Sequence, residues 1–202
     1  ADCFRMYEMF LGPIEQAKPW DTNGIDGVSK FLRRFWSLFY DERGNWIVTD
    51  EDPSKEELKV LHQAIKKVNE DIARFSFNTC VSAFMVATNE LKKLKCSKRA
   101  VLRDMVLLIA PFAPHIAEEL WHQLGNEGSI HQEGAYPEHQ EEFLGEDSIE
   151  YPVAINGRTR ATESFPADAS KEEIEKAALE LDVVKKWIDG KTVRRVIVVP
   201  KR

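Results

Sequence analysis

The most apolar stretch of the chain lies at residues 101–124 and repeats with the period of an α-helix. Apolar side chains recur there every three or four positions, as expected for one helix face, at Leu102, Met105, Ile109, Phe112, Ile116, Leu120 and Leu124. In the first half the other positions are largely apolar too, and a helix that is apolar all round is buried by its neighbours. Pro111 and Pro114 have no backbone N–H to donate to the preceding turn. We therefore predict a central helix that kinks or restarts at these prolines.

Further helical stripes precede this segment. They run through residues 2–11, 28–39, 58–72 and 77–94. Ser54 and Glu57 have the spacing of a capping box, which predicts that the third of these helices begins there. Long amphipathic helices with short connections pack as antiparallel neighbours. Residues 1–124 therefore predict an all-α helical bundle.

After residue 124 the helical period disappears. Residues 125–148 are rich in Gly, Glu and Gln, so we expect an acidic linker or a long surface segment there. From Ile149 the apolar positions alternate as in a half-buried strand, and Asn156-Gly157 is a strong hairpin signal. Ser170 and Glu173 predict the start of another helix, and residues 192–199 are β-branched like a strand. Residues 149–202 therefore predict a small α+β domain of order ββαβ, and the chain as a whole is expected to be multi-domain.

The net charge of −6 conceals an uneven distribution. Residues 101–150 carry −10, whereas residues 51–100 and 151–202 each carry +3. Local charge rather than the total sets what a surface attracts.

Three cysteines without Cys-x-x-Cys spacing indicate reduced thiols and a cytoplasmic location. No apolar run is long enough to span a membrane, the N-terminus is unlike a signal peptide, and both ends look cut from a longer protein.

Several segments resemble one family along the whole chain. They include Ala110-Pro-Phe-Ala-Pro-His-Ile-Ala-Glu-Glu-Leu-Trp121, Arg5-Met-Tyr-Glu-Met-Phe-Leu-Gly-Pro13, Lys30-Phe-Leu-Arg-Arg-Phe-Trp36 and Val153-Ala-Ile-Asn-Gly-Arg158. These segments are similar to the leucyl-tRNA synthetases, which are class I aminoacyl-tRNA synthetases. The resemblance implies an anticodon-binding-type helical domain over 1–124 and a small tRNA-contacting domain over 149–202.

The same resemblance implies a function for the parent protein and for this part of it. The parent would be a cytoplasmic leucine–tRNA ligase that uses ATP and Mg²⁺ in protein synthesis. The family's nucleotide-binding motifs and editing domain lie upstream of this stretch, so we expect no catalytic residue, cofactor or metal here and no activity of the fragment alone. The expected partners are tRNA(Leu) and the rest of the synthetase chain, with no membrane and no DNA. The alternative is a helical protein–protein interaction module without an RNA role.

Clusters of cations are the candidate tRNA contacts. Between Lys92 and Arg103 there is no acid, and a phosphate backbone attracts such a run. Basic residues at a helix end also complement the helix dipole, so a structural role stays open. Arg158 and Arg160 share a strand parity, and with the last cations they could form one basic edge. The full set of candidates is Arg33, Arg34, Lys92, Lys93, Lys95, Lys98, Arg99, Arg103, Arg158, Arg160, Lys191, Arg194 and Arg195.

Other polar and aromatic side chains give weaker signals. Glu119 and His122 form half of a di-iron motif, but no second copy is found, so a solvated helix face is favoured over metal. Base stacking by tryptophan is a further option. Trp36 and Trp187 lie on apolar stripes and are expected in the core, whereas the roles of Trp20 and Trp46 stay open. The lone histidines His62, His131 and His139 are expected at the surface.

Overall fold

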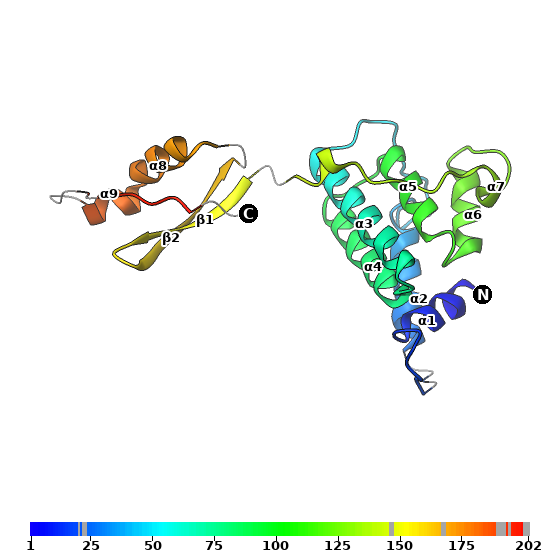
Figure 1. Cartoon of the computed structure of the whole chain (residues 1–202). Coiled ribbons are helices and arrows are strands. Elements are labelled where there is room, and N and C mark those ends of the chain that lie inside the picture. Colours follow the sequence, from blue (N-terminus) through cyan, green and yellow to red (C-terminus); the bar gives the residue numbers. More distant parts are fainter. Residues whose placement is uncertain are drawn as a thin grey trace. The chain divides into compact units, whose positions relative to one another are not determined.

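A computed structural model describes residues 1–19, 21, 24–145, 148–166, 169–188, 193 and 195–199. It divides into two compact units, Ala1–Leu144 and Gly145–Arg202 (Figure 1). The predicted fold class, a helical bundle followed by a small α+β part, is confirmed.

The first unit is a bundle built around a buried helix. Its helices are α1 (Asp2–Phe10), α2 (Ile25–Trp36), α3 (Lys55–Ala73), α4 (Phe77–Lys93), α5 (Arg99–Ile109), α6 (Pro114–Gln123), α7 (Ile130–Glu133) and the 3₁₀ turn η1 (Glu141–Phe143). In α5 every residue from Met105 to Ile109 is buried. The helix ends after Ile109 and a new one begins at Pro114, so the predicted restart is confirmed. Pro114 is the first residue of α6, where a backbone N–H would have no intrahelical partner in any case.

Helix starts in this unit are capped both locally and from a distance. The Ser54 hydroxyl accepts from the Glu57 N–H at 3.2 Å, and the Glu57 carboxylate accepts from the Ser54 N–H at 2.7 Å, so the predicted capping box is confirmed. By contrast, the residue before α6 has no side-chain cap. The Asp2 carboxylate, on α1, accepts from the N–H groups of His115 at 3.2 Å and Ile116 at 2.7 Å. Asp2 therefore caps α6 from another helix.

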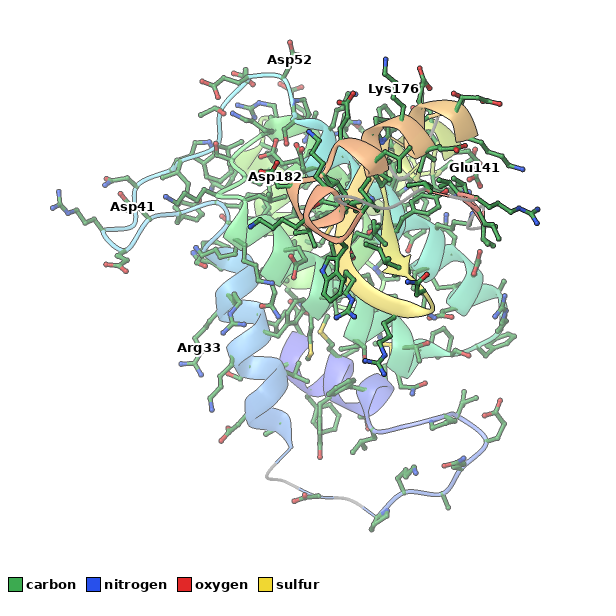
Figure 2. The ribbon with its side chains drawn as sticks, turned by 90° about the vertical axis from the view of Figure 1, so that its left-hand side faces the viewer. Arg33, Asp41, Asp52, Glu141, Lys176 and Asp182 are labelled. Carbon is green, nitrogen blue, oxygen red and sulfur yellow. The ribbon has the colours of Figure 1, made fainter. Side chains whose placement is uncertain are left out.

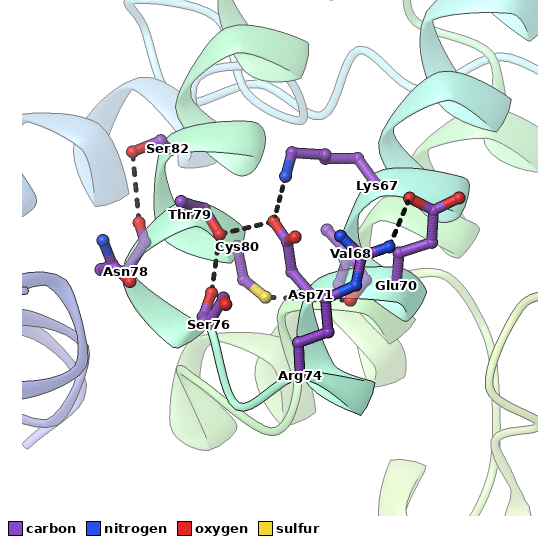
Figure 3. Close-up of polar contacts among 10 residues, drawn as sticks. All are labelled: Lys67, Val68, Glu70, Asp71, Arg74, Ser76, Asn78, Thr79, Cys80 and Ser82. Carbon is purple, nitrogen blue, oxygen red and sulfur yellow. Dashed lines mark hydrogen bonds and ion pairs between the residues drawn. The ribbon is translucent and has the colours of Figure 1, made fainter. Parts of the chain in front are cut away.

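A buried carboxylate closes the corner between α3 and α4 (Figure 3). Asp71 Oδ2 accepts from Lys67 Nζ and from the Thr79 hydroxyl, each at 2.5 Å. The Ser76 N–H donates to the Asp71 carbonyl at 2.8 Å. These bonds tie the last turn of α3 to the first turn of α4 across a turn in which Phe75 has a φ of 56°.

The segment after α6, which we expected to be part of a linker over 125–148, is packed on the bundle as far as Leu144. Ile130 is buried, and its N–H donates to Glu118 at 3.2 Å. Farther along, Asn69 Nδ2 donates to the Pro137 carbonyl at 3.2 Å, and Lys66 Nζ pairs with Glu141 at 2.9 Å. The structure therefore divides between residues 144 and 145, later than the expected end of the helical domain.

His62 lies under this packed segment, so the expectation that it is a surface residue was wrong. It is only 6% exposed. Its Nδ1 accepts from the Gln140 N–H at 3.2 Å, and its ring stacks on Phe143 at 4.6 Å. Burial lowers the pKa of His62, with a further lowering by His139 and an opposing effect of Asp104 and Glu142.

The second unit contains a β-hairpin and two helices. Strands β1 (Ser148–Ile155) and β2 (Arg158–Pro166) pair antiparallel and are joined at Asn156 (φ 51°) and Gly157 (φ 77°), which confirms the predicted hairpin. Helix α8 (Lys171–Glu180) begins with the predicted capping box, and α9 (Asp182–Ile188) follows it.

The expected last strand over 192–199 is not formed by its described residues 193 and 195–199, so that prediction was wrong for them. Residues 192 and 194 lie outside the described part of the chain. Ile197 and Val199 are largely exposed. A β-branched sequence favours a strand only where a neighbouring edge accepts its backbone hydrogen bonds and one of its faces is buried.

Candidate nucleic-acid interface

The ends of α2 and α4 bring three of the predicted cations into a group, which we call the α2–α4 patch: Arg33, Arg34 and Lys92. Arg34 Nη1 donates to Asn89 Oδ1 at 2.5 Å, and Lys92 Nζ donates to the Ser37 carbonyl at 2.7 Å. Arg33 bonds only Ser29 on its own helix and points outward from α2 (Figure 2). All these acceptors are uncharged, and no ion pair involves the three cations within the described residues. The patch therefore keeps its positive charge.

Two other cations of the predicted run have acidic partners close to them in the sequence. Lys93 pairs with Glu90 at 2.6 Å, and Arg103 with Asp104 at 3.0 Å. Lys95 is exposed just after α4. The run itself contains no acid, but the acids that flank it in sequence pair with two of its cations. It is therefore less positive than its sequence suggests.

Lys98 and Arg99 serve the fold by holding the loop that precedes α3. Lys98 pairs with Glu51, and Arg99 pairs with Asp50 and donates to the Leu124 carbonyl at 2.7 Å. A parallel bridge joins Thr49 to Lys98. The hydrogen bond and the charge of Lys98 lower the pKa of Glu51, and the pKa of Lys98 is raised in return. These two cations are weaker candidates for phosphate contact than the α2–α4 patch.

In the second unit Arg158 and Arg160 have different surroundings. Arg158 is exposed at the start of β2. Ala154 pairs with Thr159 and Val153 with Ala161, so Arg160 is an extra residue in β2. This bulge interrupts the strand alternation that we expected to place both arginines on one face. The Arg160 guanidinium lies over the Trp187 ring, 4.0 Å from its centroid.

Of the three remaining cations of the expected basic edge, the structure describes one. Arg195 is exposed. Lys191 and Arg194 lie outside the described residues. The basic edge therefore stays a prediction.

The tryptophans that pack in the fold are not all those that the sequence pattern placed there. Trp36 packs against the core and stacks on Tyr40 at 4.7 Å. Trp46 packs edge-on to the same ring at 5.1 Å, so it is part of the fold. Trp187 is 43% exposed, and its expected place in the core was wrong. Trp20 lies outside the described residues.

The described ranges contain no group of three or more His, Cys, Asp or Glu side chains that could hold a metal ion. His122 Nε2 lies 3.3 Å from Glu118, and Glu119 accepts from Gln123 at 3.0 Å, so both residues of the half-motif have other partners. No helix in the described part is long and apolar enough to cross a membrane.

The family comparison defines the class of protein. Residues 54–176 match the family described as the anticodon-binding domain of tRNA ligase. Because this match covers more than half of the chain, the chain belongs to that family. The relatives that it matches along its full length are ligases for leucine, which confirms the resemblance seen in the sequence. The chain is 56% identical over 200 residues to the leucine–tRNA ligase of Parabacteroides distasonis, which covers 99% of this chain and 21% of that protein.

Further comparisons agree with this assignment. The chain is 54% identical over 202 residues to the leucine–tRNA ligase of Bacteroides thetaiotaomicron, covering 100% of this chain and 21% of that protein. A solved structure of a LeuRS–tRNA–LeuAMS ternary complex from Agrobacterium radiobacter superposes with a TM-score of 0.72 at 29% identity. That match covers 98% of this chain and 28% of the solved chain. The chain therefore spans only about a fifth of the length of the curated relatives it matches.

Proposed function

We propose that this chain is the tRNA-docking, C-terminal part of a leucine–tRNA ligase. The whole enzyme would activate leucine with ATP and Mg²⁺ in the cytoplasm and transfer it to tRNA(Leu). This part would hold the tRNA so that its acceptor end reaches active sites elsewhere in the chain. Positioning of this kind contributes to catalysis without a reacting group. The fragment alone would therefore bind tRNA but would not activate leucine.

The observation that carries the proposal is the uncompensated charge of the α2–α4 patch. A protein that neutralises phosphates with Lys or Arg releases counterions, so its binding weakens as salt rises. Cations already paired with carboxylates must give up those partners before they can do so. Arg33, Arg34 and Lys92 bond only neutral groups in the described structure and are free of that competition. An RNA-free interaction module finds no support in the comparisons.

The test measures the binding of tRNA(Leu) by the 202-residue chain at several salt concentrations. Joint substitution of Arg34 and Lys92 by Ala should weaken binding and lower the salt slope by roughly 0.7 to 0.9 per lost phosphate contact. The matched control replaces Lys93 on α4 and Arg103 on α5 by Ala, because these two cations pair with Glu90 and Asp104. The control should change the slope less.

The melting temperature separates docking from a structural role. Arg34 and Lys92 also bridge α2 and α4, so Arg34→Lys, which keeps the charge, is measured alongside. A lower melting temperature with unchanged affinity and slope would show that the patch only stabilises the helices. Leucine-dependent ATP–pyrophosphate exchange by the fragment would contradict the proposal that leucine activation belongs to the rest of the enzyme.

A further inference from the structure

Helix α9 presents large apolar side chains that the small unit does not bury. Trp187 is 43% exposed, and Val183, one turn earlier on the same helix, is 41% exposed. The buried apolar residues of the described part of this unit are Phe165, Ile174 and Val184. Trp offers more apolar area than any of them, so its exposure on a unit with a small core indicates a contact surface.

Arg160 is held against this exposed ring by the bulge in β2. Bulges redirect side chains, and here the extra residue brings a guanidinium to 4.0 Å from the centroid of Trp187. The Arg160 Nε is buried and has no hydrogen-bond partner among the described residues. The side chain is therefore oriented by the aromatic ring, with no hydrogen bond at Nε to fix it elsewhere.

Cations flank the Arg160–Trp187 pair in sequence. Arg158 is exposed two residues before Arg160, and Lys185 and Lys186 are exposed on α9 directly before Trp187. Aromatic side chains interleaved with cations are typical of surfaces that bind unpaired nucleic acid. The centres of protein–protein interfaces are depleted in lysine. This composition favours RNA over a protein partner.

We propose that Arg160 and Trp187 form a stacking platform for an unpaired nucleobase of tRNA, while Arg158, Lys185 and Lys186 meet the neighbouring phosphates. Unpaired bases splayed out of loops stack on aromatic rings and on guanidinium planes, whereas bases inside a helix cannot. The platform therefore distinguishes a loop of the tRNA from its stems. This inference rests on the proposed tRNA-docking function and adds to it the kind of nucleotide that the second unit recognises.

The test uses the 202-residue chain with two probes, tRNA(Leu) and a fully paired RNA duplex. Trp187→Ala should weaken tRNA binding by about tenfold, within the roughly 5- to 150-fold range for one stacked base. It should leave duplex binding unchanged, because the duplex offers phosphates without an unpaired base. Trp187→Phe, which keeps a ring, should lose less. Trp187→Phe should also remove the part of the tRNA-induced fluorescence change that arises from Trp187.

Substitutions of Arg160 and Arg158 distinguish a stacking contribution to tRNA binding from a purely electrostatic one. Arg160→Lys keeps the charge but loses the planar group, so affinity should fall while the salt slope stays the same. Arg158→Ala should instead lower the slope by roughly 0.7 to 0.9. Lys176→Ala, an exposed cation on α8 (Figure 2), is the matched control and should change neither quantity appreciably.

Each outcome decides one of the two proposals. If the parent chain does not bind tRNA, the proposed function fails. If it binds, and Trp187→Phe, Trp187→Ala and Arg160→Lys all bind like the parent, the platform is overturned and α9 fits a protein partner instead. Equal losses on tRNA and on duplex would also overturn it. If Trp187→Ala lowers the melting temperature, Trp187→Phe and Arg160→Lys decide the question.

Discussion

At the scale of single residues, Asp71 shows how a buried charge is made tolerable. Burial alone would raise the pKa of Asp71, but hydrogen bonds from Lys67 and Thr79 and the charges of Lys67 and Arg74 outweigh it. The pKa of this carboxyl is therefore held below its ordinary value. A carboxyl with a lowered pKa in the folded state stabilises the fold when it is ionised and loses that contribution on protonation.

Asp71→Asn should reduce the free energy of unfolding by about 1 to 3 kcal/mol at pH 7, because Lys67 loses its charged partner and Thr79 loses a strong acceptor. The contribution of Asp71 is complete above its unfolded pKa near 3.9 and is lost as pH falls through the lower folded value. The difference between parent and variant should therefore shrink below about pH 4. Urea unfolding from pH 7 to pH 2 measures it. Glu70→Gln, at an exposed neighbour, is the control, and a pH-independent difference would contradict the assignment.

Residue patterns predicted local contacts better than distant ones. Both capping boxes and the Asn156-Gly157 turn are formed by residues within four positions of one another, and all are present. Among the candidate cations, the pairing of Lys98 and Arg99 with Glu51 and Asp50 bridges more than forty positions. Charge density along the sequence cannot indicate such partners. The sequence pattern therefore indicates candidate cations without separating those that folding neutralises from those that it leaves unpaired.

At the scale of elements, the start of α6 depends on Asp2, a residue more than a hundred positions away in sequence. Its own start, at Ala113, offers no capping side chain, whereas the Asp2 carboxylate accepts from two of its first N–H groups. A carboxylate at this position also complements the helix dipole. The periodicity predicted that α5 and α6 exist and separate near Pro114. It could not predict that α1 supplies the cap, because nothing local marks a contact across more than a hundred residues.

Asp2→Ala should lower the free energy of unfolding by about 0.5 to 2 kcal/mol, the usual range for loss of an N-cap. Asp2→Asn, which keeps one acceptor oxygen, should recover part of this loss. Chemical denaturation of the 202-residue chain measures both. Glu8→Ala, at an exposed acid on the same helix, provides the comparison. Equal effects of Asp2→Ala and Glu8→Ala would mean that the cap contributes nothing.

At the scale of the whole molecule, the sequence predicted two domains but placed the end of the first at residue 124. Residues 125–144 carry no helical period, and composition alone favours a linker. The structure nevertheless buries Ile130, and Tyr136 donates to the Leu108 carbonyl at 3.4 Å. A few anchoring side chains at irregular spacing hold this segment on the bundle. Periodicity cannot detect them, because they follow no repeat.

Two truncations test the boundary that the structure suggests. A chain ending at Leu144 keeps every contact of the first unit, so it should melt cooperatively at the temperature at which that unit melts in the 202-residue chain. A chain ending at Leu124 loses Ile130, whose burial alone contributes about 1.5 to 3 kcal/mol, and the cover over His62. It should therefore melt at a clearly lower temperature. Circular dichroism of the three chains measures this. If both truncated chains melt at the same temperature, residues 125–144 are a linker and the helical domain ends at residue 124, as the sequence pattern predicts.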